Sequence, residues 1–228
     1  MALLGSSSFL YEHKSNFKPM KRKIVMTGLA VAALLVFAFK SGEKETYKTL
    51  EIGETAPMID SEMESTKGQD MTLKSLKGNN GTLVIFSCNT CPFVIAWEDR
   101  YPELKELAED AEIGFALINS NEAKRNGDDS MEKMQQHAEE KGYPEIPYLV
   151  DNNSALANAF GAKTTPHVFL FDANWSLVYE GAIDDNHESA KAAKQHYLKD
   201  ALKNLEQGKT IDPSNTKSIG CSIKRVKS

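Results

Sequence analysis

The chain has 228 residues, of which 41% are hydrophobic and 26% are charged, and its formal net charge is −5. This composition fits a globular protein with one domain of ordinary size and an additional N-terminal segment, and it excludes a disordered chain. Residues 1–40 hold six basic residues and one acidic residue, so the formal charge of the remaining residues is more negative than the net charge of the whole chain. An acidic body argues against nucleic acid as a partner, because nucleic-acid binding needs a basic surface.

The N-terminal part has the pattern of an export signal. A basic cluster at residues 21–23 precedes residues 24–39, which carry no charge. A basic cluster before a short apolar stretch is typical of a secretory signal, whereas a membrane span needs about 20 residues. We therefore expect residues 20–38 to direct the chain to the periplasm or another extracytoplasmic compartment. Cleavage after Ala38 and an uncleaved anchor are the alternatives, and only the anchor would attach the protein to a membrane.

Composition divides the chain into four segments. We expect a folded domain between a polar linker and a short tail, since the periodic apolar pattern is confined to the middle of the chain. The expected segments are an extension with signal peptide or anchor at 1–40, a linker at 41–50, a domain at 51–208, and a tail at 209–228 that carries Cys221.

The first half of the domain alternates strands and helices. A short strand and turn are expected at 72–78, and the continuous apolar run at 82–86 predicts a buried strand. Residues 92–110 predict an amphipathic helix, kinked by Pro102. A second buried strand is expected at 113–118. It is followed by a helix over residues 130–142, with Ser130 as its N-cap and Gly142 at its C-terminal end.

The second half ends in a hairpin and a helix. Residues 147–150 read as a brief extended segment, and 154–160 as a short helix ended by Gly161. Residues 167–171 and 177–181 flank a turn and predict a β-hairpin. A last helix is expected at 189–207. This order predicts an α/β fold with a central mixed sheet and helices on both faces.

The sequence Cys-Asn-Thr-Cys-Pro at residues 88–92 stands where the first buried strand meets a helix. The N-terminus of a helix offers free N–H groups and a positive dipole end, which favour a thiolate. Two intervening residues let the sulfurs of Cys88 and Cys91 reach bonding distance. We therefore predict a redox-active pair with either cysteine as the nucleophile; a buried structural pair is the alternative.

Further segments match the thioredoxin superfamily. They are 86–94, 116–121, 164–166, 183–186 and 220–224. On these residues the chain resembles that superfamily over roughly 50–208, and more closely its peroxiredoxin-like group of alkyl hydroperoxide reductase and thiol-specific antioxidant proteins. The resemblance implies a thioredoxin-like fold with a cis peptide bond before Pro166. Thr165 and Pro166 would then face the cysteine pair and bind substrate.

The chain departs from both patterns at the cysteines. Ser87 stands before the pair where thioredoxin has Trp, and Pro92 follows the pair instead of separating it. Peroxiredoxins carry Pro-x-x-x-Thr-x-x-Cys. Aligning Cys91 with that Cys puts Val84 at the Pro position and Cys88 at the Thr position. Cys91 also aligns with the first cysteine of thioredoxin, which leaves Cys88 as the unusual one.

The remaining candidate residues have a functional and a structural interpretation. Cys221 is either an inert tail cysteine or a resolving thiol, because three cysteines leave one unpaired when two are joined. His167 with Cys88 and Cys91 could bind copper, although a packed histidine is commoner. The run at 98–100 is expected to be a solvated helix face, with tuning of the thiols by Glu98 or Arg100 as the alternative. Surface positions are expected for His137, His187 and His196.

These observations favour an extracytoplasmic thiol–disulfide oxidoreductase that acts through Cys88 and Cys91 on protein or small-molecule thiols and disulfides. A thiol-dependent peroxidase or antioxidant protein is the second hypothesis. A copper-binding or partner-binding module without turnover is the third. No cofactor and no nucleic-acid partner are expected, and a membrane enters only through an uncleaved anchor.

Overall fold

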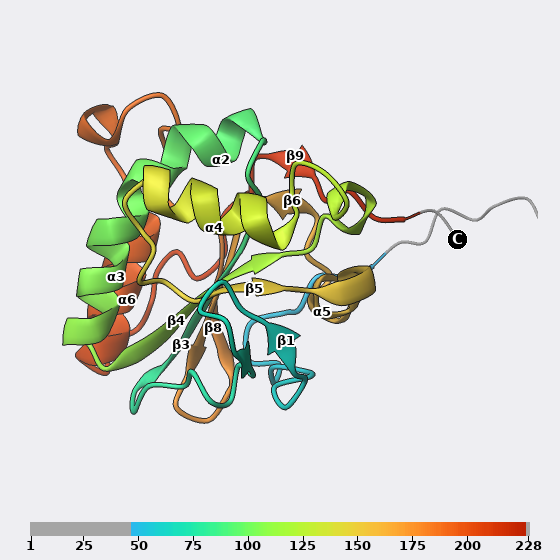
Figure 1. The fold of residues 1–228 in the computed structure, drawn as a ribbon. Coiled ribbons are helices and arrows are strands. Elements are labelled where there is room, and N and C mark those ends of the chain that lie inside the picture. Colours follow the sequence, from blue (N-terminus) through green and yellow to red (C-terminus); the bar gives the residue numbers. More distant parts are fainter. Residues whose placement is uncertain (1–46, 227–228) are drawn as a thin grey trace, which may run out of the picture. The chain divides into compact units, whose positions relative to one another are not determined.

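The computed structural model describes residues 47–226, so the expected export signal lies outside the described residues. A five-stranded mixed sheet forms the centre, in the order β5-β4-β3-β7-β8 (Figure 1). β4 pairs in parallel with β3 and β5, whereas β7 is antiparallel to both β3 and β8. The five strands are β3 Gly81–Ser87, β4 Ile113–Asn119, β5 Tyr148–Val150, β7 His167–Asp172 and β8 Leu177–Gly181.

Helices and two small sheets surround this centre. The described helices are α2 Pro92–Trp97, α3 Tyr101–Asp110, α4 Met131–Glu140, α5 Ala155–Phe160 and α6 Tyr197–Glu206. The small sheets pair β1 Met63–Glu64 with β2 Asp70–Met71, and β6 Thr164–Thr165 with β9 Cys221–Ser222. None of the helices between residues 47 and 226 is long and apolar enough to cross a bilayer.

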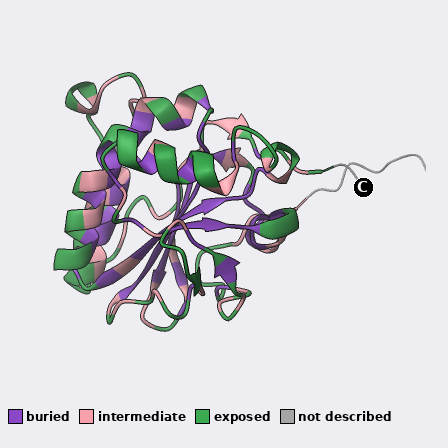
Figure 2. Cartoon of the chain, viewed as in Figure 1, coloured by how far each residue is buried: buried purple, intermediate pink, exposed green. Residues whose placement is uncertain are grey.

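Alternation along the central strand divides the core into two layers. Leu83 and Ile85 of β3 point into a cluster that α3, α4 and α6 cover. Val84 and Phe86, which alternate with them, point into the opposite cluster against α5 and the segment that leads into β3. Every residue of β3 is buried (Figure 2), so the strand that precedes the cysteines is a rigid support for them.

The expected architecture and most of the expected helices and strands are confirmed. The mixed α/β sheet with helices on both faces has the thioredoxin-like arrangement. Ser130 accepts a hydrogen bond from the backbone N–H of Lys133, as expected of an N-cap. Gly161 ends α5 in the left-handed conformation with φ 61°, which a glycine adopts without strain. The predicted hairpin is β7 and β8.

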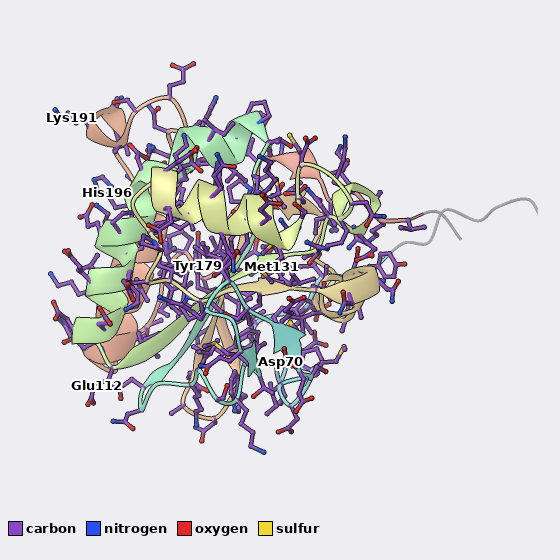
Figure 3. The ribbon with its side chains drawn as sticks, in the orientation of Figure 1. Asp70, Glu112, Met131, Tyr179, Lys191 and His196 are labelled. Carbon is purple, nitrogen blue, oxygen red and sulfur yellow. The ribbon has the colours of Figure 1, made fainter. Side chains whose placement is uncertain are left out.

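Three expected elements differ from the structure. The helix expected at 189–207 begins only at Tyr197; His196 is its N-cap residue, and Lys191 lies in a separate 3-10 turn at Ala190–Ala192 (Figure 3). The strand expected within 72–78 lies earlier, as β2 at Asp70–Met71, whereas the expected turn is present after Thr72. The helix expected at 92–110 is divided by a 3-10 turn at Glu98–Arg100, next to the position where Pro102 removes a backbone donor.

Candidate redox site

The cysteine pair lies at the strand–helix junction that the sequence predicted. Cys88 follows β3 directly, Cys91 is the N-cap residue of α2, and Pro92 is the first residue of that helix. Proline is favoured at this position because its missing N–H would have no partner inside the helix. Cys88 is 2% and Cys91 4% exposed, and both are free thiols.

Thr165 meets both sulfurs from the neighbouring β6. Its hydroxyl lies 3.2 Å from Sγ of Cys88, and its carbonyl oxygen accepts a hydrogen bond of 3.1 Å from Sγ of Cys91. The Thr165–Pro166 peptide bond is cis, as the resemblance implied. The structure therefore brings Thr165 against Cys88 and Cys91, from which it is 77 and 74 residues distant in the sequence.

Cys221 joins the same cluster. It belongs to β9, which pairs with β6 in the register Thr165↔Cys221. Its side chain packs against the cluster that Cys88, Cys91 and Val94 form. The tail cysteine, which is partly exposed, thus lies beside the cysteine pair.

The three thiols differ in their tendency to ionise. The pKa of Cys91 is lowered to about 4, first because the Cys88 thiol hydrogen-bonds its sulfur, and further because Cys221 and the backbone N–H of Val94 do so. Burial opposes this shift of the pKa. The pKa of Cys88 is raised, first by its hydrogen bond to Cys91 and then by burial. Burial also raises the pKa of Cys221. The pKa of Cys91 is accordingly the lowest of the three thiols.

A buried carboxylate holds the loop between the two cysteines. Asp129 is fully buried and accepts hydrogen bonds of 2.9 Å from the backbone N–H of Asn89 and from the Asn119 amide. It also accepts one of 3.0 Å from the Asn121 amide. Three donors on one carboxylate fix the loop in place. Asp129 was not expected from the sequence, because it lies in a polar run that has the composition of a solvated turn.

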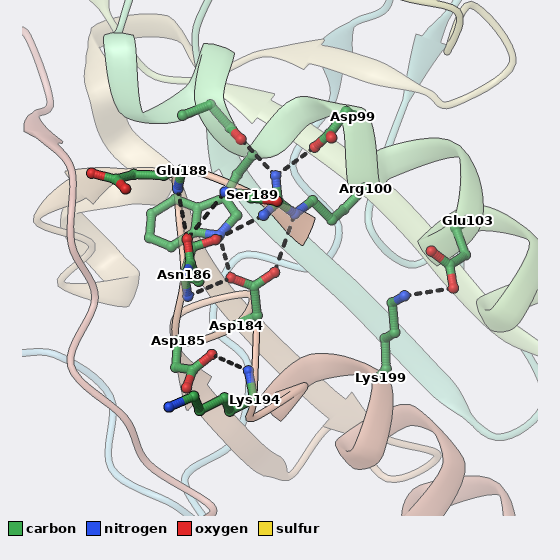
Figure 4. A network of polar contacts seen from close by, with 12 residues as sticks. Asp99, Arg100, Glu103, Asp184, Asp185, Asn186, Glu188, Ser189, Lys194 and Lys199 are labelled. Atoms are coloured by element: carbon green, nitrogen blue, oxygen red, sulfur yellow. Dashed lines mark hydrogen bonds and ion pairs between the residues drawn. The ribbon is translucent and has the colours of Figure 1, made fainter. Parts of the chain in front are cut away.

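The run at 98–100 was wrongly expected to be a solvated helix face. Glu98 and Arg100 are 3% and 2% exposed. Nε of Arg100 donates to Asp184 at 3.1 Å, and one of its terminal nitrogens donates to the carbonyl of Asn186 at 2.7 Å (Figure 4). The side chains turn inward because a 3-10 turn replaces the regular helix here, so the helical periodicity used for the prediction does not apply. Asp99 does remain exposed.

The histidines do not gather around the sulfurs. His167 is buried, its Nδ1 accepts from the backbone N–H of Lys163 at 3.2 Å, and its Nε2 hydrogen-bonds Glu180. Both ring nitrogens therefore have partners, which fits a packed histidine. No group of three His, Cys, Asp or Glu side chains within residues 47–226 has the arrangement of a metal site.

The other three histidines within residues 47–226 are half-buried instead of fully at the surface. His137 hydrogen-bonds Glu98 at 2.6 Å. His187 packs against the rings of Phe93 and Trp97 on α2. The expectation of surface positions therefore overestimated their exposure, because segments that look polar in sequence fold back onto α2 and α3.

Fold and site together define a thioredoxin-fold redox protein. A model of the Redoxin family matches residues 51–196, and the chain belongs to this family. No curated protein is a significant match to the chain.

Solved structures agree with this assignment. An uncharacterized conserved protein from Geobacillus kaustophilus is 32% identical with a TM-score of 0.73, over 80% of this chain and 96% of that one. A hypothetical protein from Sinorhizobium meliloti is 28% identical with a TM-score of 0.72, over 80% and 98%. The peroxidoxin BcpB from Mycobacterium tuberculosis shares the fold at 16% identity and a TM-score of 0.53, over 69% and 97%.

Proposed function

We propose that the protein is a thiol–disulfide oxidoreductase in which Cys91 is the nucleophile and Cys88 a resolving thiol. The observation that carries the proposal is the environment of Cys91. Its sulfur lies at the N-terminus of α2, has a pKa lowered to about 4, and has the Cys88 thiol as its hydrogen-bond partner. A stabilised thiolate next to a second thiol is what disulfide exchange requires.

The exchange balances with the two cysteines alone. The Cys91 thiolate attacks one sulfur of a substrate disulfide, whose S–S bond breaks, and one substrate thiolate leaves and takes up a proton. The Cys88 sulfur then attacks Cys91 in the mixed disulfide and gives up its proton to the second departing thiolate. Two electrons pass from the cysteine pair to the substrate, and a Cys88–Cys91 disulfide remains. The reverse sequence oxidises a substrate dithiol.

Substrate contact is proposed for Thr165 and Pro166. The Thr165 carbonyl oxygen and hydroxyl are the polar groups of β6 nearest the sulfurs. A substrate sulfur bonded to Cys91 would therefore lie next to residue 165, which is 1% exposed and is covered by β9. Substrates of this class are protein or small-molecule thiols and disulfides.

The function is tested by mixing the reduced full chain with an aromatic disulfide whose thiolate product is coloured. We expect the Cys88→Ser variant to keep the first release of product thiolate, because Cys91 makes the first attack. Cys91→Ser should slow that release by more than about 100-fold, because the nucleophile is removed. The proposal fails if Cys91→Ser releases thiolate at the rate of the unmodified chain. Mass mapping after treatment with oxidised glutathione should find a disulfide bond between Cys88 and Cys91.

A thiol-dependent peroxidase is the second candidate. The same lowered pKa of Cys91 that favours attack on a disulfide also favours attack on a peroxide oxygen. Hydrogen peroxide consumption with a dithiol as the reductant separates the two functions. Peroxide turnover that exceeds turnover of the aromatic disulfide would favour the peroxidase.

A further inference from the structure

The C-terminal segment is bound along the edge of the redox site. β9 pairs with β6, and beyond it the backbone N–H of Ile223 donates to the carbonyl of Lys163 at 3.2 Å. The backbone N–H of Lys224 donates to the Asn121 side chain at 2.8 Å, and Ile223 is 5% exposed. These contacts hold the segment as an added strand and fix the position of Cys221.

The position of Cys221 depends on a close approach between the backbones of Gly220 and Thr165. A Cβ atom at Gly220 would lie 2.2 Å from the carbonyl oxygen of Thr165, a distance that real Cβ atoms do not adopt. The same carbonyl accepts the hydrogen bond from Cys91. Only glycine therefore lets the tail lie against the residue that the nucleophile also contacts.

Cys91 has two cysteine neighbours. Cys88 and Cys91 are buried in one small cluster with Val94, and Cys221 packs against that cluster from β9, which pairs with β6. Phe93, in the first turn of α2, packs against the same cluster. Both Cys88 and Cys221 therefore lie beside Cys91, but their surroundings differ.

Exposure distinguishes the two neighbours of Cys91. Cys88 is 2% exposed and lies beneath the loop, whereas Cys221 is partly exposed. A disulfide between Cys88 and Cys91 has both sulfurs buried. A disulfide between Cys91 and Cys221 has one sulfur that an external thiol can reach. Reduction by a partner is easier from the second arrangement, since attack needs access along the S–S axis.

We propose that Cys221 is a second resolving thiol, and that a Cys91–Cys221 disulfide is the oxidised form that exchanges with external thiols. This rests on the proposed function, which supplies the mixed disulfide at Cys91. The Cys221 thiol loses its proton and attacks the Cys91 sulfur, the bond to the substrate sulfur breaks, and the substrate leaves as a thiol. Equally, Cys221 attacks Cys91 in a Cys88–Cys91 disulfide, and Cys88 leaves and takes up the proton. The second step needs no additional oxidant.

The experiment treats the reduced full chain and its Cys88→Ser variant with one equivalent of oxidised glutathione. Samples are quenched in acid, alkylated and mapped by mass spectrometry. We expect Cys88→Ser to form a Cys91–Cys221 bond. Gly220→Val should slow formation of that bond by about tenfold or more, because the effective concentration of Cys221 at Cys91 falls. Gly127→Ala is the matched control, since a Cβ there meets nothing closer than 3.8 Å.

The outcomes separate this inference from the proposed function. A Cys88→Ser chain that accumulates glutathione on Cys91 while Cys221 stays free overturns the inference. In a further variant, Cys221→Ser, a Cys88–Cys91 bond would still support the proposed pair. A chain that forms only Cys91–Cys221 supports the inference and contradicts Cys88 as a resolving thiol. If Cys88→Ser does not fold, the same disulfide-linked peptides are mapped in the wild-type chain. In the wild-type chain, absence of any Cys91–Cys221 peptide during the time course overturns the inference.

Discussion

At the scale of single residues, the three cysteines have the same side chain and unequal chemistry. Cys91 receives hydrogen bonds from Cys88, from Cys221 and from the backbone of Val94, all of which stabilise its negative charge. Cys88 is close to the buried carboxylate of Asp129, which further disfavours its thiolate. The environment therefore lowers the pKa of one cysteine in a cluster of three thiols and raises that of the other two.

The first prediction concerns the pH dependence of alkylation. Because the pKa of Cys91 is lowered to about 4, its thiolate exists at every pH above that value and is lost only below it. We expect iodoacetamide to label Cys91 at a nearly constant rate between about pH 6 and 8, whereas a free thiol with a pKa of about 8.5 would react about tenfold faster with each pH unit. Rates are measured at cysteine resolution by mass spectrometry.

Urea-unfolded chain is the control for this measurement. Unfolding removes the hydrogen bonds to Cys91, so the labelling rate of Cys91 should again rise with pH as for a free thiol, with an inflection near about pH 8.5. Native Cys88 and Cys221 should stay slow until alkaline pH because their pKa values are raised. A native Cys91 rate that climbs steeply between pH 6 and 8 would show that its thiolate is not stabilised.

At the scale of elements, the short helix α2 is anchored by a buried ion pair. Arg100 follows α2 in the 3-10 turn and donates to Asp184, which also accepts from the Trp97 indole N–H at 2.7 Å. Asp184 lies in the segment after β8. This cluster joins the end of the helix that carries Cys91 to the far edge of the sheet, and it has no local sequence signature.

The second prediction concerns this pair. Arg100→Leu removes one partner and leaves the Asp184 carboxylate buried without its cation. We expect the free energy of unfolding at pH 7 to fall by about 3–5 kcal/mol, as measured by urea denaturation. The matched control is Glu103→Ala, which breaks the more exposed Glu103–Lys199 pair of Figure 4 and should change the free energy by less than about 1 kcal/mol. Equal effects of the two changes would contradict a structural role for Arg100.

At the scale of the whole molecule, the site is assembled from three separate parts of the chain. The strand–helix junction supplies Cys88 and Cys91, β6 supplies Thr165, and the C-terminal β9 supplies Cys221. The tail must therefore fold onto the domain before the cluster is complete. The chain from β3 to β9 acts as one unit in building the site.

The third prediction concerns the destination of the chain. The basic and apolar segment at residues 20–38 is proposed to export the domain. We expect residues 20–45, fused to a reporter that is active only after translocation, to give a signal. The matched control replaces residues 21–23 by neutral residues and should reduce that signal. Activity of a reporter that works only in the cytoplasm would overturn the extracytoplasmic assignment.

Much of the fold follows from short-range patterns. The apolar runs that became β3 and β4 are recognisable because buried parallel strands are apolar on both faces. The end of α5 at Gly161 follows from one residue. The late start of α6 does not follow from a short-range pattern, because residues 189–196 have an acceptable helical composition. Their backbone contacts with Asp185 decide their conformation.

From residue patterns, the sequence determined the order of strands and helices and the position of the cysteine pair at a helix start, and its resemblance to the thioredoxin superfamily implied the thioredoxin-like fold and the cis peptide bond before Pro166. Each of these patterns lies within a few positions, such as an apolar run for a buried strand or a cysteine before a helix. Only the tertiary structure decided that the pKa of Cys91 is lowered while those of Cys88 and Cys221 are raised, that Arg100 is buried and that Cys221 packs against the cysteine pair. These features depend on hydrogen bonds and strand pairings between distant segments, and such contacts leave no local pattern because folding alone brings the partners together.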